Sequence, residues 1–145
     1  MFLYFNYSWV PNSTLYFKSF IDAGYDCEMV TELNLTSWQP TSEYKTVVVY
    51  LHDEDQLPII NYWLDHSPFL QDSFLIQHDT TDHQDVQHWT NRKPDLVMQR
   101  ELFEGSQNPR GVTVEPFHFP IPSIYDSSYE QTNDVMFYGC MTNEI

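Results

Sequence analysis

The sequence is short of several residue types, and each shortage excludes a class of protein. With only 4 glycines, and neither a GxGxxG nor a Walker motif, it offers no glycine-rich loop for a dinucleotide or ATP. No GxSxG motif marks an α/β-hydrolase nucleophile. The 2 cysteines are too few for a disulfide framework. The sequence has only 6 Lys and Arg against 21 Asp and Glu. The resulting net charge of −15 argues against binding nucleic acid or an anionic membrane.

Long hydrophobic runs are also missing, although hydrophobic residues are plentiful. No apolar stretch reaches the length that spans a membrane, and the first residues lack the basic region of a signal peptide. We therefore expect a cytoplasmic protein with no membrane insertion. The chain is 41% hydrophobic and 17% aromatic, which suffices for a packed core, and its 145 residues suit one domain, residues 1–145.

Strand and helix patterns alternate along the chain. Strands are expected at 1–7, 25–33, 45–52, 73–78, 95–102, 112–119 and 135–141, and helices at 11–24, 53–69 and 80–92. The run 45–52 is continuously apolar and β-branched, as in strands buried on both faces of a parallel sheet. This order predicts an α/β fold, a doubly wound, mainly parallel Rossmann-like sheet in a single three-layer domain.

Local signals also predict where the helices begin and end. Ser13 or Thr14 is expected to cap the first helix, and Gly24 to end it. The acidic residues at 53–55 are expected in the first turn of the second helix, where the helix dipole favours them. In the third helix, Val86 and Trp89 should face inward.

Polar residues directly follow most of the predicted strands. In open parallel sheets, ligands bind beyond the carboxyl ends of the strands, so these residues are the candidates for a binding site. They are Asn6, Ser8, Trp9, His52, Asp53, His78, Asp79, Asp82, Arg100, Glu101 and His118.

Four of these residues allow a structural or a functional interpretation. Arg100 and Glu101 form an internal salt bridge, or Arg100 holds a carboxylate, phosphate or sugar hydroxyl of a ligand. His118 is a half-buried histidine or a catalytic one at the sheet edge. Trp9 follows the first strand, where its ring could stack on a sugar.

Residues 78–88 combine three histidines with three aspartates: His78, Asp79, Asp82, His83, Asp85 and His88. Such side chains bind zinc, manganese or iron. However, His83 and His88 are five residues apart and would face poorly on a helix. We favour a strand end that caps a helix and lines a ligand cleft, and we expect no metal and no cofactor.

Four segments in order resemble the N-terminal domain of GT-B-type glycosyltransferases of the spore-maturation and capsule-synthesis kind. They are "FLIQHDTTD" at 74–82, "PDLVMQRELF" at 94–103, "VEPFHFPIPSIY" at 114–125 and "NDVMFYGCMTNE" at 133–144. Residues 74–145 resemble the family by motif, whereas residues 1–73 resemble it only in the order of elements.

The resemblance implies an acceptor-binding domain that works with a second, nucleotide-sugar-binding domain. By its motifs, the resemblance carries over Asp79, Asp82 and Arg100, with His78 as a neighbour. Our hypothesis is that Asp79 or His78 is the base. The other candidates that follow strands are expected with Asp82 and Arg100 around a saccharide acceptor: Asn6, Ser8, Trp9, Glu101 and His118. The sequence stops where the donor domain is expected, so a nucleotide sugar should bind only with a second domain or a partner chain. We therefore do not expect catalysis by this domain alone.

Two other functions remain open at this point. The first is a non-enzymatic module that binds a glycan or a protein on the same sheet. The second is a metal-dependent protein that uses the cluster at residues 78–88.

Overall fold

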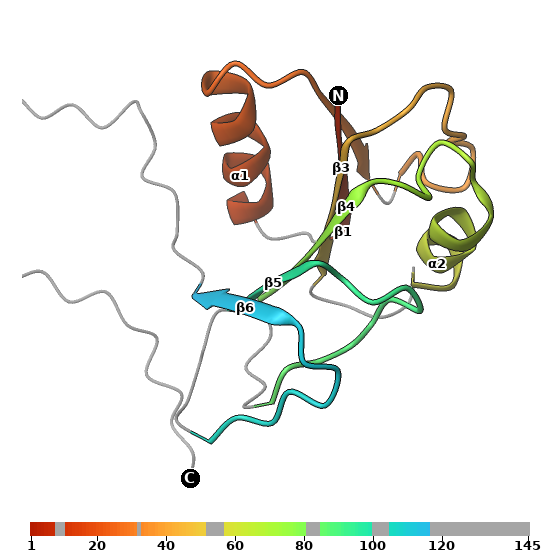
Figure 1. The fold of residues 1–145 in the computed structure, drawn as a ribbon. Helices are drawn as coiled ribbons and strands as arrows, with labels where there is room; N and C mark the ends of the chain where they lie inside the picture. The colour runs from red at the N-terminus through yellow and green to blue at the C-terminus, as the bar shows by residue number, and fades with distance from the viewer. Residues whose placement is uncertain (8–10, 32, 52–56, 81–84, 100–104, 117–145) are drawn as a thin grey trace, which may run out of the picture.

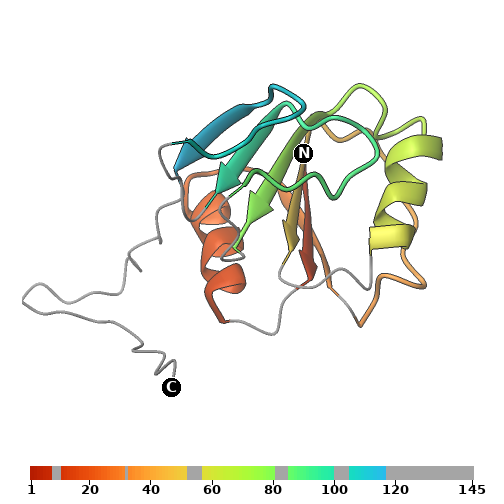
Figure 2. The same ribbon diagram turned by 90° about the horizontal axis from the view of Figure 1, so that it is seen from below.

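The computed structural model describes residues 1–7, 11–31, 33–51, 57–80, 85–99 and 105–116. These residues contain one sheet of six parallel strands in the order β2-β1-β3-β4-β5-β6, and all its arrows run in one direction in Figure 2. The strands are β1 (Phe2–Tyr7), β2 (Cys27–Thr31), β3 (Thr46–Leu51), β4 (Phe74–Asp79), β5 (Leu96–Gln99) and β6 (Thr113–Pro116).

Two helices are described, one on each face of the sheet. Helix α1 (Pro11–Asp22) and helix α2 (Leu57–His66) lie on opposite sides of the strands (Figure 1). The structure thus confirms the predicted α/β fold with a doubly wound parallel sheet. Because β1 lies between β2 and β3, the direction of winding changes between β1 and β3, which is where such sheets bind ligands.

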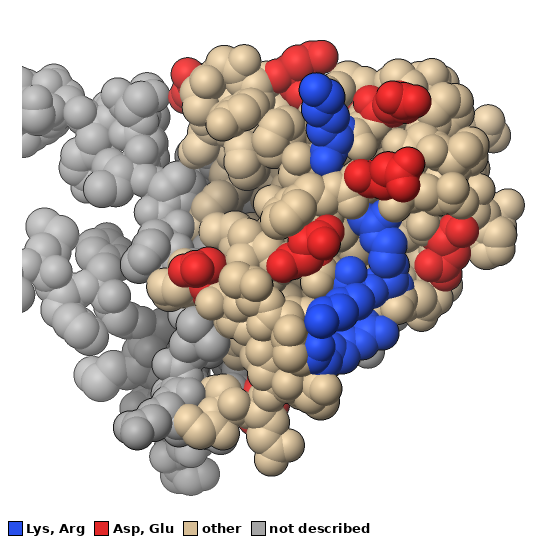
Figure 3. All heavy atoms as spheres, viewed as in Figure 1, with Lys and Arg blue, Asp and Glu red and all other residues tan. Residues whose placement is uncertain are grey.

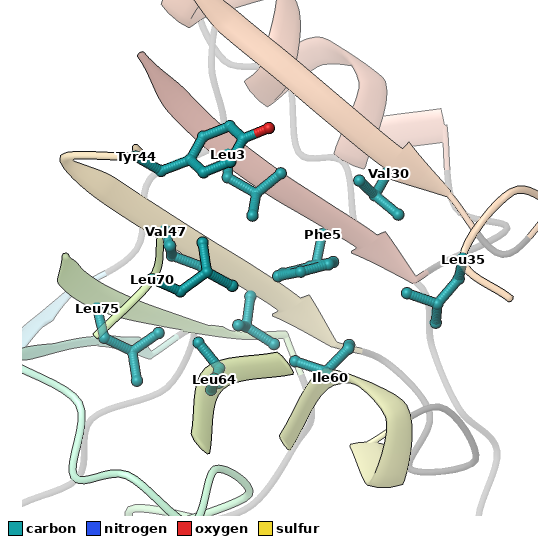
Figure 4. Packing of buried hydrophobic residues seen from close by; sticks show 11 residues of the cluster. Leu3, Phe5, Val30, Leu35, Tyr44, Val47, Ile60, Leu64, Leu70 and Leu75 are labelled. Atoms are coloured by element: carbon teal, nitrogen blue, oxygen red, sulfur yellow. The ribbon is translucent and has the colours of Figure 1, made fainter. Parts of the chain in front are cut away.

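The larger part of the core fills the space between the sheet and α2. Leu3, Phe5 and Val47 point from the strands toward Ile60 and Leu64 of α2 (Figure 4), and all five are buried. Burial of such side chains stabilises the fold by about 1.5–3 kcal/mol each. The apolar stripe of helix α2 therefore holds it against the sheet.

The opposite face carries a smaller and more polar core. Tyr4, Val48 and Tyr50 from the strands pack against Tyr16 of α1, with Phe17 and Phe20 at the margin. These side chains alternate with those that face α2, as the pleat of a strand requires. The face toward α1 is thus lined by phenol rings whose hydroxyl groups need partners.

Local predictions at the two ends of α1 had opposite outcomes. The helix begins at Pro11, so the prediction that Ser13 or Thr14 caps it is wrong: both lie inside the first turn. Proline suits a first helical position, because its fixed φ fits the helix and its missing N–H costs nothing there. Gly24 is confirmed as the end signal, with φ of 85°.

The helix expected at residues 80–92 is absent from the described part of that segment, which is residue 80 and residues 85–92. Gln77, buried in β4, accounts for this difference. Its Nε2 donates to Gln87 O at 2.6 Å, and its Oε1 accepts from Trp89 N at 3.3 Å. These bonds tie the backbone at residues 87 and 89 to β4, and the described residues of this segment form bends and irregular structure. Val86 is buried as predicted.

The remaining predictions about elements concern residues only partly described. Helix α2 is described from Leu57, so the acidic residues at 53–55 lie outside the description. The continuations of β5 and β6 beyond Gln99 and Pro116, and the strand predicted at 135–141, also lie outside it.

Candidate functional site

Three polar side chains lie in a row near the carboxyl edge of the sheet, the edge at which the strands end. Asn6 of β1 is in register with Tyr50 of β3, and Tyr50 is in register with His78 of β4. Residues in register on parallel strands point to the same face. This row lies beside the change of winding between β1 and β3, the position at which sheets of this kind bind ligands.

His78 lies between two phenol rings and is 1% exposed. Its ring centroid is 4.6 Å from that of Tyr16 and 4.7 Å from that of Tyr50, and both ring pairs are edge-to-face. Burial lowers the pKa of His78 to about 3, because a protonated imidazole would lose its hydration. The side chain is therefore neutral at neutral pH.

Asn6 offers a buried hydrogen-bond acceptor at this edge. The side chain is 7% exposed, and its Nδ2 approaches the Met29 sulfur at 3.6 Å. Its Oδ1 is buried and has no hydrogen-bond partner among the residues that the structure describes. A buried polar atom without a partner costs about 1–3 kcal/mol, so a donor that reaches Oδ1 would recover this energy.

Tyr4, two residues before Asn6 on the same face, adds a second such atom. Its hydroxyl oxygen is buried and likewise has no hydrogen-bond partner within the described part of the chain. Burial raises the pKa of Tyr4, and the nearby Tyr50 and Tyr16 raise it further. The phenol therefore stays protonated and can donate a hydrogen bond.

Asp79 points to the other face of the sheet from His78, because successive residues of a strand alternate. It is in register with Gln99 of β5, and both side chains are 0% exposed. The two residues predicted as alternative bases are thus both buried at the carboxyl edge, but on opposite faces. A single ligand would have to reach past the end of β4 to contact both.

The sheet also separates the two ends of the His/Asp cluster. His78 faces α1, whereas residues 85–90 pack on the α2 face through Gln77. His78 and His88 therefore cannot bind the same ion. Within the described ranges, no three His, Cys, Asp or Glu side chains lie close enough to hold a metal. Asp82 and His83 lie outside the description.

Of the nine residues predicted for the site, the structure places three: Asn6, His78 and Asp79. The other six lie outside the described residues, and their places stay predictions: Ser8, Trp9, Asp82, Arg100, Glu101 and His118. Each of the six lies within three residues after the last described residue of a strand or of the segment that ends at Thr80.

Four buried residues of this edge were not predicted from the sequence: Tyr4, Tyr16, Tyr50 and Gln99. Tyr50 could have been found as a phenol near the end of the β-branched run "TVVVYL", shortly before the candidates His52 and Asp53. Gln99 could have been found as a polar residue inside an apolar strand. Tyr16 was seen only as part of a helical stripe, because its contact with His78 is a tertiary one.

No described helix combines the length and apolar character that crossing a membrane requires. Comparisons of the chain with protein-family models, with curated proteins and with solved structures gave no match, so the relation to GT-B glycosyltransferases stays a prediction from the sequence.

Proposed function

We propose that the carboxyl edge of this sheet binds a saccharide acceptor, and that the chain is the acceptor-binding half of a GT-B-like glycosyltransferase. The fold supports this proposal, because parallel doubly wound sheets bind ligands at this edge. The motifs at 74–82 and 94–103 support it as well. The nucleotide sugar would bind to a second domain or to a partner chain.

The observation that carries the proposal is the buried Oδ1 of Asn6 at the change of winding. A sugar presents several hydroxyl groups at fixed spacing, and one of them can donate to this oxygen. Sites of this kind combine a mostly apolar wall with a few convergent polar groups. Here the rings of Tyr50 and Tyr16 provide the wall beside Asn6.

In this proposal Asp79 is the candidate base. The acceptor oxygen would attack the anomeric carbon, the bond from that carbon to the nucleotide phosphate would break, and the acceptor proton would pass to a carboxylate. His78, with a pKa of about 3, is too weak a base for this step at neutral pH and would instead position the edge. Ser8, Trp9, Asp82, Arg100, Glu101 and His118 would surround the acceptor.

The test is a thermal-shift titration of the full chain with neutral mono- and disaccharides. A ligand at about ten times its Kd stabilises the native state by about 1.4 kcal/mol, which raises the Tm by a few degrees. We expect Asn6→Ala to abolish this shift. Asn61→Ala is the matched control, because Asn61 on α2 bonds the backbone of Trp89 and Asn91, away from the carboxyl edge.

Each saccharide shift is measured against the Tm of the same variant without ligand, so differences in basal stability cancel. If no saccharide shifts the wild type, or if both variants lose the shift alike, the proposed site is wrong. Asp79→Asn then separates two functions of the edge. A changed saccharide affinity places Asp79 at the acceptor, whereas an unchanged affinity favours a non-enzymatic glycan-binding module.

A further inference from the structure

The described positive charges gather on a surface that the proposed acceptor site does not use. Five Lys and Arg residues are described, and three of them, Arg92, Lys93 and Arg110, lie on the loops that precede β5 and β6. Figure 3 shows Lys and Arg side chains grouped together on one face of the molecule. These loops lie at the amino edge of the sheet, opposite the carboxyl edge. In a chain of net charge −15, such a concentration of cations needs a reason.

The bonds of these cations go to neutral groups. Arg110 donates from Nη1 to Thr90 O and from Nη2 to Asn91 O, both at 2.9 Å. Lys93 Nζ donates to Gly111 O at a distance of 3.3 Å. Across the described ranges the only ion pair is Lys18–Asp22. Lys93 and Arg110, both exposed, therefore keep charges that no described carboxylate neutralises at contact distance.

Arg92 differs from Lys93 and Arg110, because its bonds fix the structure of a loop. It donates to the carbonyls of Leu70 and Ser73 at 2.6 and 2.9 Å, which fixes the loop before β4. Three carboxylates, those of Asp95, Asp65 and Asp72, also act on its charge. Its role is structural.

A hollow lies between the two loops at the same edge. Its volume is about 410 Å³, and it is lined by Lys93, Pro94, Asp95, Gly111, Val112 and Thr113. Such a volume admits a small ligand, Lys93 is the cation that lines it, and Arg110 directly precedes its wall residue Gly111. One carboxylate oxygen of Asp95 is already hydrogen-bonded, because its Oδ2 accepts from Leu75 N at 2.8 Å.

His88 provides an independent observation nearby. Both ring nitrogens are buried, and neither has a hydrogen-bond partner among the described residues. Arg110 donates to the carbonyls of Thr90 and Asn91, two and three residues after His88, so its side chain lies on the same loop. Burial lowers the pKa of His88, and the charges of Arg110 and Lys93 lower it further. The neutral ring carries one N–H, and an oxyanion could accept its hydrogen bond.

We propose that Lys93, Arg110 and His88 form a binding site for a small phosphate-type oxyanion at the amino edge of the sheet. Lys93 and Arg110 supply positive charge that is already oriented by the carbonyls they bond. The imidazole N–H of His88 supplies a buried donor. Elsewhere the net negative charge of the chain repels anions, so binding should be confined to this place. The site is independent of the acceptor site proposed at the opposite edge.

The test is a calorimetric titration of the full chain with inorganic phosphate, at constant low ionic strength set by chloride. We expect saturable binding with one phosphate per chain, and at least a tenfold increase in Kd for Lys93→Gln. Lys93→Arg should restore the affinity, because it keeps the charge. Lys45→Gln removes one exposed cation outside the cluster and should leave Kd within twofold of the wild type.

Two further measurements make the result specific. The imidazole NMR signals of His88, assigned by their loss in His88→Gln, should move during the phosphate titration. Phenyl phosphate should bind at least as tightly as inorganic phosphate if the natural ligand is a phosphate ester, and more weakly if it is the free ion. Absence of saturable binding, or equal losses in Lys93→Gln and Lys45→Gln, would overturn the proposal.

Discussion

At the scale of single residues, the most informative side chain is a histidine that burial keeps neutral at neutral pH. His78 is 1% exposed between two phenol rings, and the only resolved cause of its lowered pKa is burial. A histidine after a strand is typical of acid–base sites, and on that ground the sequence predicted it as a candidate base. Its tertiary surroundings, which no local pattern reveals, instead favour a neutral packing role.

The pH dependence of stability tests this role. The folded pKa of about 3 lies below the ordinary 6.5, so the unfolded chain binds a proton more readily. The contribution of His78 is fully present above pH 6.5 and is lost as the pH falls toward 3. Between pH 7 and pH 4.5 the wild type should lose on the order of 2–3 kcal/mol of unfolding free energy through this group.

The measurement is urea unfolding across this pH range for the wild type and for His78→Phe. Phenylalanine keeps an aromatic ring between Tyr16 and Tyr50 but does not titrate. Carboxylates titrate in both proteins, so they cancel in the difference. If the two stability curves fall in parallel, His78 is not a buried neutral histidine.

At the scale of elements, the C-terminal end of α1 is set by one glycine. Gly24 has φ of 85°, and its N–H donates to Ile21 O at 2.9 Å, while Tyr25 N donates to Phe20 O at 3.0 Å. These two bonds are those of a Schellman motif. A Cβ at position 24 would meet nothing within 4 Å, so only the backbone conformation demands glycine there.

Gly24→Ala should therefore destabilise the protein by about 1 kcal/mol, because the left-handed conformation is costly for a residue with a Cβ. Gly24→Asn should cost less, since asparagine tolerates this conformation. Urea unfolding of both variants measures the difference. Equal losses for Ala and Asn would show that the cost arises elsewhere than in the backbone conformation.

The elements also show what the sequence could predict and what it could not. The six described strands were all predicted, because apolar β-branched and aromatic runs such as "TVVVYL" are local signals. The helix expected at 80–92 was wrong in its described part, because Gln77 holds that segment through bonds across ten and twelve residues. The row of Asn6, Tyr50 and His78 needed the strand order, which local patterns do not contain.

At the scale of the whole molecule, charge is unevenly distributed. The net charge is −15, and three of the five described cations lie together before β5 and β6. The rest of the described surface therefore has few positive groups to offset its carboxylates. Repulsion among like charges opposes the compact state.

Raising sodium chloride from roughly 20 to 500 mM should accordingly raise the Tm at pH 7 by a few degrees. Added salt shortens the Debye length to below about 10 Å and so weakens the repulsion between the carboxylates. Near pH 4.4, the sequence pI, the same addition of salt should have little effect. Thermal unfolding at both pH values checks this. A rise of equal size near the pI would point to specific ion binding rather than to screening.

The place of β1 between β2 and β3 has a consequence for how the protein is made. β1 pairs with β2 on one side and with β3 on the other, and both partners follow it in the chain. During synthesis β1 emerges from the ribosome before both partners, and one of its two edges stays unpaired until β3, which ends at Leu51, has emerged. A nascent chain stalled before that point presents an aggregation-prone strand, which is a natural target for a ribosome-associated chaperone.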